Sequence, residues 1–378
     1  MTLGNKIKRR LYKRWGISPL VQNINLNPVG YQRSVLICYV DYTLISKQIE
    51  NNNLCHSIPK EEMVIIRRFI ECDYVIDVCG YDAISVIPMI ENKKYDIIFG
   101  FGDVYREMSI RNPLSQKILY LTESPAEYSF EKEKERIDYF YLRTGIKIEM
   151  VRSGVCFKVG DIELSDIIIN MCESSLIEKY NIKNYKICPS GLVNAKFIHK
   201  TDKKDIKKFM WFGSMGIIHK GLDILVDTFE KTKDCQLFVC GANEKEIEKY
   251  KISLNKNNIR NCGFVNVNSQ LFIELVDQCA YMILPSCAEA TSTSVITCMR
   301  HGMIPVITRN LGFNEFFEFC YFLEDYHIEY MEQKIKELSN NNIEDMKKLS
   351  SQIYQRFNKK FSINTFNHEF KSILDEIG

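Results

Sequence analysis

The sequence predicts an α/β protein made of two doubly wound, Rossmann-like domains that face a central cleft. Its 378 residues are too many for one ordinary core and suggest two domains of about 150–200 residues. Short apolar runs alternate with longer amphipathic stretches, a pattern typical of parallel sheets covered by helices on both faces. The pattern weakens over 183–207, where Pro189, Ser190 and Gly191 interrupt it, and then begins again.

The first half opens the series of strands at Ser34–Tyr39 (SVLICY), whose unbroken apolar run fits a strand buried on both faces. Lys60–Glu71 has apolar residues at helical spacing and predicts a helix. The remaining strands are predicted at Tyr74–Val78, Tyr95–Phe99, Lys117–Thr122 and Ile167–Met171, with helices at Ile84–Glu91 and Glu131–Thr144.

The second half repeats this order. Its strands are predicted at Phe209–Phe212, Gln236–Cys240, Ile259–Val265, Tyr281–Leu284, Ile304–Thr308 and Tyr321–Glu324. Its helices are predicted at Gly221–Lys231, Asn243–Lys251, Gln270–Asp277, Thr293–His301, His327–Leu338, Asp345–Phe361 and Asn364–Ile377. We place the first domain at 1–198, the second at 199–355 and a separate tail helix at 356–378.

Composition excludes several classes of protein. The formal net charge of +2 provides no overall attraction to nucleic acid. The 14 cysteines are scattered, and several lie in apolar runs, so we expect buried thiols in a reduced cytoplasmic protein rather than a disulfide framework. No apolar run is long enough to span a bilayer, and the N-terminus lacks the apolar core of a signal peptide.

One segment, Asn5–Trp15, departs from this balance. Six basic residues alternate there with apolar and aromatic ones. The segment fits either a peripheral contact with the anionic inner face of the cell membrane or a solvated arm, and the sequence leaves both open.

A glycine-rich segment, Gly213–Asp223, follows the first strand of the second domain directly. Gly213, Gly216 and Gly221 allow a tight turn and close approach of a ligand to the backbone. The helix that begins near Gly221 directs its N-terminal dipole toward the turn, and Lys220 adds a full charge. Strand, glycine loop, lysine and helix together predict a diphosphate site; the alternative is a plain turn with an exposed lysine.

A second polar segment follows the strand at Tyr281–Leu284. Glu289 lies at the carboxyl end of that strand, where open α/β sheets bind ligands, and can accept hydrogen bonds from sugar hydroxyls. Four hydroxyl residues follow it and can bond phosphate or sugar oxygens, or simply cap the next helix: Thr291, Ser292, Thr293 and Ser294.

These two segments, about 70 residues apart, resemble those of retaining GT-B-fold glycosyltransferases, particularly family 4 (glycosyl transferases group 1). That family has a glycine-rich turn with a Lys-Gly pair, then Pro-Ser-x-x-Glu, a second Glu and Gly-x-Pro-Val. The second stretch here reads PSCAEATSTSVITCMRHGMIPVIT. Its matches are Pro285, Ser286, Glu289, Gly302, Pro305 and Val306. The tail also fits, because GT-B chains often cross back to the first domain.

Two positions depart from the family pattern. Ser214 stands where the family usually has an arginine, and Thr297 stands where it has the second glutamate, which is implied to hold the ribose. Diphosphate binding must therefore rely on Lys220, Ser214 and backbone N–H groups, while the ribose contact of Thr297 is in question.

The resemblance implies transfer of a sugar, with retention, from a nucleoside diphosphate sugar to a glycan or lipid-linked acceptor. It implies no metal and no cofactor besides the donor, and the sequence has no Asp-x-Asp metal motif. Bacterial surface polysaccharide synthesis is the expected setting. Lys220 and Glu289 are the predicted catalytic residues of the second domain, and the leaving phosphate itself can take the acceptor proton.

The first domain offers weaker candidates. His56 resembles a histidine that related enzymes place near the donor sugar, but an ordinary loop histidine explains it equally well. Glu123 and Glu127 follow a strand end and are candidates for acceptor contacts. His219 is expected to be a supporting or exposed residue.

Gly100 and Gly102 also end a strand. A dinucleotide fingerprint needs a third glycine at position 105, which is Tyr105, and a helix opening there, so a nicotinamide enzyme is disfavoured. We expect both glycines to line the acceptor side of the cleft. Two alternatives to a transferase remain: a non-catalytic nucleotide-sugar-binding module on the same fold, and a GT-B nucleotide-sugar epimerase.

Overall fold

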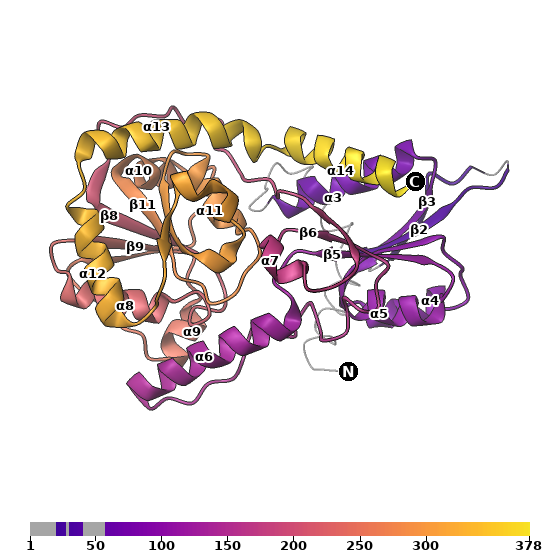
Figure 1. Ribbon diagram of the computed structural model, residues 1–378, viewed down its shortest axis with the longest axis horizontal. Helices are drawn as coiled ribbons and strands as arrows, with labels where there is room; N and C mark the ends of the chain where they lie inside the picture. Colours follow the sequence, from indigo (N-terminus) through magenta and orange to yellow (C-terminus); the bar gives the residue numbers. More distant parts are fainter. Residues whose placement is uncertain (1–19, 28–29, 41–56) are drawn as a thin grey trace.

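The computed structural model describes residues 20–27, 30–40 and 57–378, and it shows two sheets with flanking helices as two bodies (Figure 1). This confirms the predicted α/β architecture of two Rossmann-like domains. The expectations for Asn5–Trp15 and for His56 lie outside the described residues.

The first sheet has seven strands in the order β1-β3-β2-β4-β5-β6-β7. They are β1 (Leu20–Ile24), β2 (Ser34–Tyr39), β3 (Val75–Gly80), β4 (Ile97–Gly100), β5 (Gln116–Leu121), β6 (Ile167–Asn170) and β7 (Lys183–Lys186). The helices are α3 (Ile58–Glu71), α4 (Ile87–Ile90), α5 (Gly102–Arg111), α6 (Ala126–Thr144) and α7 (Ser174–Ile177), with a 3₁₀ turn at Ile84–Val86. All neighbouring pairs are parallel except β1 with β3.

The second sheet has six parallel strands in the order β10-β9-β8-β11-β12-β13. They are β8 (Asp205–Phe212), β9 (Gln236–Cys240), β10 (Ile259–Gly263), β11 (Cys279–Leu284), β12 (Ile304–Thr308) and β13 (Tyr321–Leu323). The helices are α8 (Leu222–Lys231), α9 (Glu244–Lys249), α10 (Gln270–Gln278), α11 (Thr293–Met299), α12 (Ile328–Ser339), α13 (Ile343–Lys360) and α14 (Ile363–Ile377), with 3₁₀ turns at Arg309–Leu311 and Asn314–Phe319.

Both sheets lie in cores of buried hydrophobic residues. Every residue of β11 is buried, as are all but the first residue of β2, which is why their sequences are apolar on both faces. Two strands, β1 and β7, were not predicted, and both are edge strands. In β1 the apolar residues are interrupted by Gln22 and Asn23, and β7 is polar and partly exposed. The start of β8 was also missed because Asp205–Lys208 is charged, although Lys204 just before it is buried and donates to the carbonyls of Val276 and Cys279.

Helix α6 belongs to the first half of the chain but packs against the second domain (Figure 1). Phe140 is part of the second domain's hydrophobic core. Arg136, which has no exposed surface, donates through Nη2 to the carbonyl of Pro285 at 2.9 Å and stacks over the Tyr326 ring. Arg143 pairs with the buried Asp223. The chain therefore leaves the first domain after β5 and contributes an arm to the second.

The C-terminus makes the reverse crossing. Phe361, just after α13, lies in the core of the second domain, whereas Phe370 on α14 lies in that of the first. The Phe370 ring meets Phe69 of α3 and Phe99 of β4 edge to face, with centroids 6.3 and 5.9 Å away. The two domains thus exchange helices, with α6 crossing one way and α14 the other. Among the described residues, no helix is long and apolar enough to cross a membrane.

Candidate functional site

The loop that follows β8 turns over the ring of Trp211. A side chain at Gly213 would collide with that ring, because a Cβ there would lie 2.4 Å from the indole. Trp211 is fully buried, and its Nε1 donates to the carbonyl of Lys220 at 3.1 Å. Gly216 has φ of 81°, a conformation that favours glycine. The Trp211 indole therefore contacts the loop near both of its ends, by packing against Gly213 and by a hydrogen bond to Lys220.

A buried carboxylate occupies backbone donors of this loop. Glu246 of α9 accepts from the N–H groups of Gly216 at 2.9 Å and of Ile217 at 3.3 Å. Backbone donors of this loop were expected to bind an anionic ligand, whereas these two bind the carboxylate of Glu246. Ser214 and Met215 are the exposed residues of the loop. Anion binding here must therefore depend more on side chains than the glycine pattern suggests.

Lys220 and Glu289, the predicted catalytic residues of the second domain, form an ion pair. Nζ of Lys220 contacts Oε1 of Glu289, and both side chains are about nine-tenths buried. Burial lowers the pKa of Lys220 to about 7, and the nearby charge of Arg152 acts in the same direction. The two residues come from loops at the carboxyl ends of the adjacent parallel strands β8 and β11, the edge where such sheets bind ligands.

The loop that carries Glu289 touches the first domain. Ser124 donates to the carbonyl of Glu289 at 2.9 Å, and Thr291 donates to the carbonyl of Met171, at the end of β6, at 2.7 Å. Ala290 packs into the first domain's hydrophobic core. The ion pair therefore lies where the two domains meet, the place predicted for the cleft.

The other predicted hydroxyls differ in their surroundings. Ser292 precedes α11, and its hydroxyl pairs with that of Ser294 at 3.1 Å, while Thr293 and Ser294 are half-exposed. Their contacts with a ligand stay predictions.

Thr297 is engaged by the segment that connects the domains. It is buried, and its hydroxyl accepts from the N–H of Leu192 at 3.1 Å. Gly191 lies so close that a Cβ there would be 3.1 Å from the Thr297 nitrogen, and Arg300 donates to the Gly191 carbonyl. At the position implied to hold the ribose, the structure thus has a buried threonine whose hydroxyl accepts a hydrogen bond from the linker.

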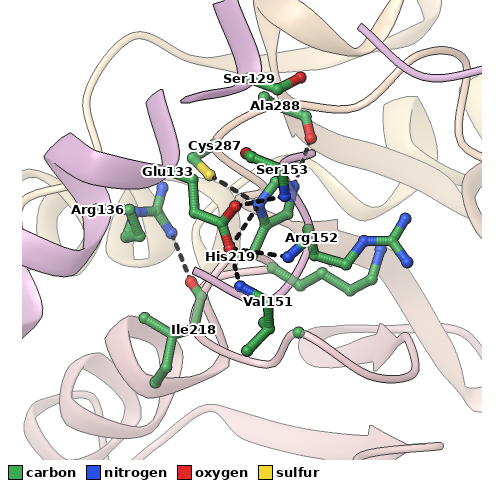
Figure 2. Close-up of polar contacts among 12 residues, drawn as sticks. Ser129, Glu133, Arg136, Val151, Arg152, Ser153, Ile218, His219, Cys287 and Ala288 are labelled. Atoms are coloured by element: carbon green, nitrogen blue, oxygen red, sulfur yellow. Dashed lines mark hydrogen bonds and ion pairs between the residues drawn. The ribbon is translucent and has the colours of Figure 1, made fainter. Parts of the chain in front are cut away.

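His219 is a buried structural residue. Its Nε2 bonds the carbonyl of Ala288, so Nε2 carries the proton, and Nδ1 accepts from the Cys287 thiol at 3.3 Å (Figure 2). Burial lowers the pKa of His219 and raises that of Cys287 to about 11, so imidazole and thiol both stay neutral. The two residues join the glycine loop to the Glu289 loop rather than providing a nucleophile.

Two residues that the sequence analysis did not single out shape the same site. Glu133 of α6, only 2% exposed, accepts from three consecutive backbone N–H groups: Val151 at 3.0 Å, Arg152 at 3.2 Å and Ser153 at 2.7 Å (Figure 2). Arg152 then lies against Gly216, where a Cβ would be 2.8 Å from its Cγ. No local pattern reveals this contact, because the residues are far apart in sequence.

Glu123 and Glu127, the two candidates for acceptor contacts, have different partners. Glu123 pairs with Arg152, with 2.7 Å between Oε1 and Nη2, and its charge also acts on Lys220, so it borders the ion-pair site. Glu127 accepts from the Tyr180 hydroxyl at 3.1 Å, a contact within the first half of the chain. Neither observation tests an acceptor contact.

Gly100 and Gly102 lie in close backbone packing, and their place on the acceptor side of the cleft stays a prediction. A helix, α5, does open at Gly102, and both glycines are explained by backbone packing. A Cβ at Gly100 would lie 2.0 Å from the carbonyl oxygen of Cys38, and one at Gly102 would lie 2.6 Å from that of Tyr81. Helix α5 was not predicted because glycines at positions 100 and 102 favour a loop.

A cavity of about 290 Å³ lies between α6 and the ends of β11, β12 and β13. Its charged lining consists of Lys132, Arg136, Arg309, Glu135, Glu324 and Asp325. The three positive and three negative charges balance, so this cavity has no net attraction for a diphosphate. The Lys220 region is the better candidate.

Comparison with known proteins agrees with this geometry. Residues 206–341, from β8 into the loop after α12, match the family model described as glycosyl transferases group 1. The chain has a GT-B fold, and its second domain resembles the group 1 glycosyltransferases. The match includes both the Gly213 loop and the Glu289 loop. No curated protein sequence matches this chain.

Solved structures extend the GT-B likeness over both domains. Sucrose-phosphate synthase of Thermosynechococcus elongatus is 9% identical with a TM-score of 0.58, over 92% of this chain and 99% of that one. HepE of Anabaena, in complex with UDP and glucose, is 11% identical with a TM-score of 0.55, over 91% and 100%. TarM of S. aureus is 15% identical with a TM-score of 0.51, over 76% of this chain but only 57% of TarM. At these identities the likeness concerns the fold.

Proposed function

We propose that this protein transfers a sugar, with retention, from a nucleoside diphosphate sugar to a glycan or lipid-linked acceptor. The reaction would belong to the synthesis of a bacterial surface polysaccharide and take place at the cytoplasmic face of the membrane. The observation that supports this most is the buried Lys220–Glu289 pair at the meeting of two GT-B domains. The Anabaena structure in the same fold contains UDP and glucose, which fits a donor of this class.

The chemistry assigns separate roles to the two residues. The bond between the anomeric carbon and the leaving phosphate oxygen breaks, and the bond to the acceptor oxygen forms. Negative charge grows on the diphosphate, which the Lys220 ammonium stabilises, and the acceptor proton passes to the leaving phosphate. Glu289 accepts hydrogen bonds from hydroxyls of the transferred sugar. No metal or further cofactor takes part in this proposal.

The test is Lys220→Ala. We expect transfer to fall by roughly 100-fold or more, because removing one preorganised group that stabilises developing charge has an effect of that size. The rate of transfer is measured as release of nucleoside diphosphate. The assay uses a panel of nucleotide sugars, with and without glycan acceptors. Lys336→Ala, which changes a surface lysine of α12, is the matched control. Unchanged turnover in Lys220→Ala would contradict the proposal.

A non-catalytic binding module is the second candidate, because the hydroxyl of Thr297 is already bonded to Leu192. Calorimetric binding of the same nucleotide sugars, run beside the turnover assay, separates the two. Tight binding with no donor hydrolysis or transfer for any acceptor would favour the module.

A further inference from the structure

The glycine loop provides less positive charge than a diphosphate needs. Ser214, its exposed tip residue, is uncharged, and Glu246 already holds the N–H groups of Gly216 and Ile217. Lys220 is the loop's cation, and Glu289 neutralises it. A donor diphosphate carries at least two negative charges, so a second cation near this loop would be expected.

Arg152 lies at the required place. Its Cγ and Cδ would be 2.8 and 3.0 Å from a Cβ at Gly216, so only glycine at position 216 allows the side chain to lie there. Its charge also acts on Lys220, whose pKa it lowers, so the two cations are near neighbours. The arginine thus lies against Gly216 of the same loop that carries the lysine.

The guanidinium is only partly used. Nη2 pairs with Glu123, at 2.7 Å, whereas the buried Nε has no hydrogen-bond partner among the described residues. The side chain is 30% exposed, so it borders solvent and is not sealed in the core. Planar guanidinium groups with free donors bind phosphate oxygens in pairs.

The backbone of Arg152 is fixed to the second domain. Glu133 accepts from its N–H and from those of both neighbours, and Glu133 belongs to α6. The same helix is anchored to the glycine loop and the Glu289 loop, because Arg136 donates to the carbonyls of Ile218 and Pro285. The backbone of Arg152 is therefore fixed by the helix that also contacts the glycine loop and the Glu289 loop.

We propose that Arg152 binds the diphosphate of the donor and supplies the positive charge that Ser214 does not provide. The inference rests on the proposed function and adds a residue to its donor site. In the ligand-free protein Glu123 holds the guanidinium, and the diphosphate competes with that carboxylate on binding.

The experiment measures binding of UDP, GDP, ADP, CDP and TDP to the full chain by calorimetry. For the nucleoside diphosphate that the wild type binds, Arg152→Ala should weaken affinity roughly 10- to 100-fold, while the corresponding nucleoside loses little. Arg309→Ala, which removes an exposed arginine paired with Glu324, should change nothing. Adding Ser214→Arg to Arg152→Ala should restore much of the loss, since the charge returns to the same loop.

The proposed function and the role of Arg152 are contradicted by different results. If the wild type binds none of the five diphosphates, the proposed function is wrong. If it binds one and Arg152→Ala binds it equally well, the function stands and the inference is wrong. Should Arg152→Ala not fold, Glu123→Gln provides the opposite test: removing the competing carboxylate should tighten binding several-fold, and unchanged affinity overturns the inference.

Discussion

At the residue scale, Lys220 combines the charge that an anionic donor requires with a burial that opposes this charge. Burial lowers the pKa of Lys220 to about 7, whereas the pKa of an exposed lysine is about 10.4. Glu289 and a bound diphosphate both favour the protonated form. Donor binding is therefore expected to be coupled to proton uptake whenever the free protein has lost this proton.

The first prediction is that affinity for a nucleoside diphosphate falls as pH rises from 7 to 9. Because the pKa of Lys220 is lowered, the free protein above pH 7 must take up a proton before the ammonium can bind the anion. The loss should approach about tenfold per pH unit. The ligand phosphate is largely ionised throughout this range, so its own titration contributes little.

Lys220→Arg is the control for this pH profile, because a guanidinium stays charged at all these pH values. Calorimetry at pH 7, 8 and 9 should show a flatter profile for this variant than for the wild type. Equal slopes in both proteins would show that another group sets the pH dependence.

At the scale of single elements, α6 acts as a positioning arm. Its Phe140 lies in the second domain's core, its Arg136 holds carbonyls of the two site loops, and its Glu133 orders residues 151–153. Three consecutive N–H groups that converge on one buried carboxylate fix the direction of the loop. The arm, rather than the glycine loop itself, determines where Arg152 lies.

We therefore predict that Glu133→Ala weakens nucleoside diphosphate binding several-fold although it removes no positive charge. The loss should vanish when Arg152 is already alanine, since Glu133 acts through Arg152. A double-mutant cycle measured by calorimetry checks this coupling. Glu135→Ala, on the same helix and paired with Lys132, should have no effect. Strictly additive losses would show that Glu133 acts on the site by another route.

At the scale of the whole molecule, the exchanged helices join the two domains at two places. Helix α14 closes the core of the first domain, where Phe370 is fully buried against Phe69 and Phe99. It follows α13 directly, so the helix that completes the core of the first domain is joined in sequence to the last helix of the second. Stability of the first domain should therefore depend on residues at the far end of the chain.

Phe370→Ala is predicted to destabilise the first domain by about 3–5 kcal/mol, the usual effect of truncating a buried phenylalanine. Trp211 lies in the second domain and the other tryptophan is Trp15, so fluorescence in a Trp15→Phe background reports on the second domain alone. Urea unfolding followed by circular dichroism should shift to lower urea, while the Trp211 transition stays in place.

Lys371→Ala, at an exposed pair with Asp375, controls for changes on the same helix. If circular dichroism and Trp211 fluorescence shift together in Phe370→Ala, the two domains unfold as one unit, and the predicted independence is wrong.

Most regular elements were predictable because buried parallel strands have continuous apolar sequences, as in SVLICY of β2 and the stretch that forms β11. The edge strands β1 and β7 were not, since Gln22 and Asn23 interrupt the apolar residues of β1 and the residues of β7 are polar and partly exposed. Helix α5 was not predicted because the glycines near its start favour a loop. These glycines are required because the carbonyl groups of Cys38 and Tyr81, which are distant in sequence, lie too close to allow a side chain.

The sequence by itself determined the fold class, the Gly213 loop and the Lys220 and Glu289 segments, since each depends on neighbours within a few residues. Only the tertiary structure decided that Glu246 takes the loop's N–H groups, that Thr297 bonds the linker, and that Arg152 lies on Gly216. These contacts join residues tens of positions apart. Helix periodicity and strand alternation describe one element at a time, whereas such contacts depend on how α6, α9 and the linker are brought together by packing.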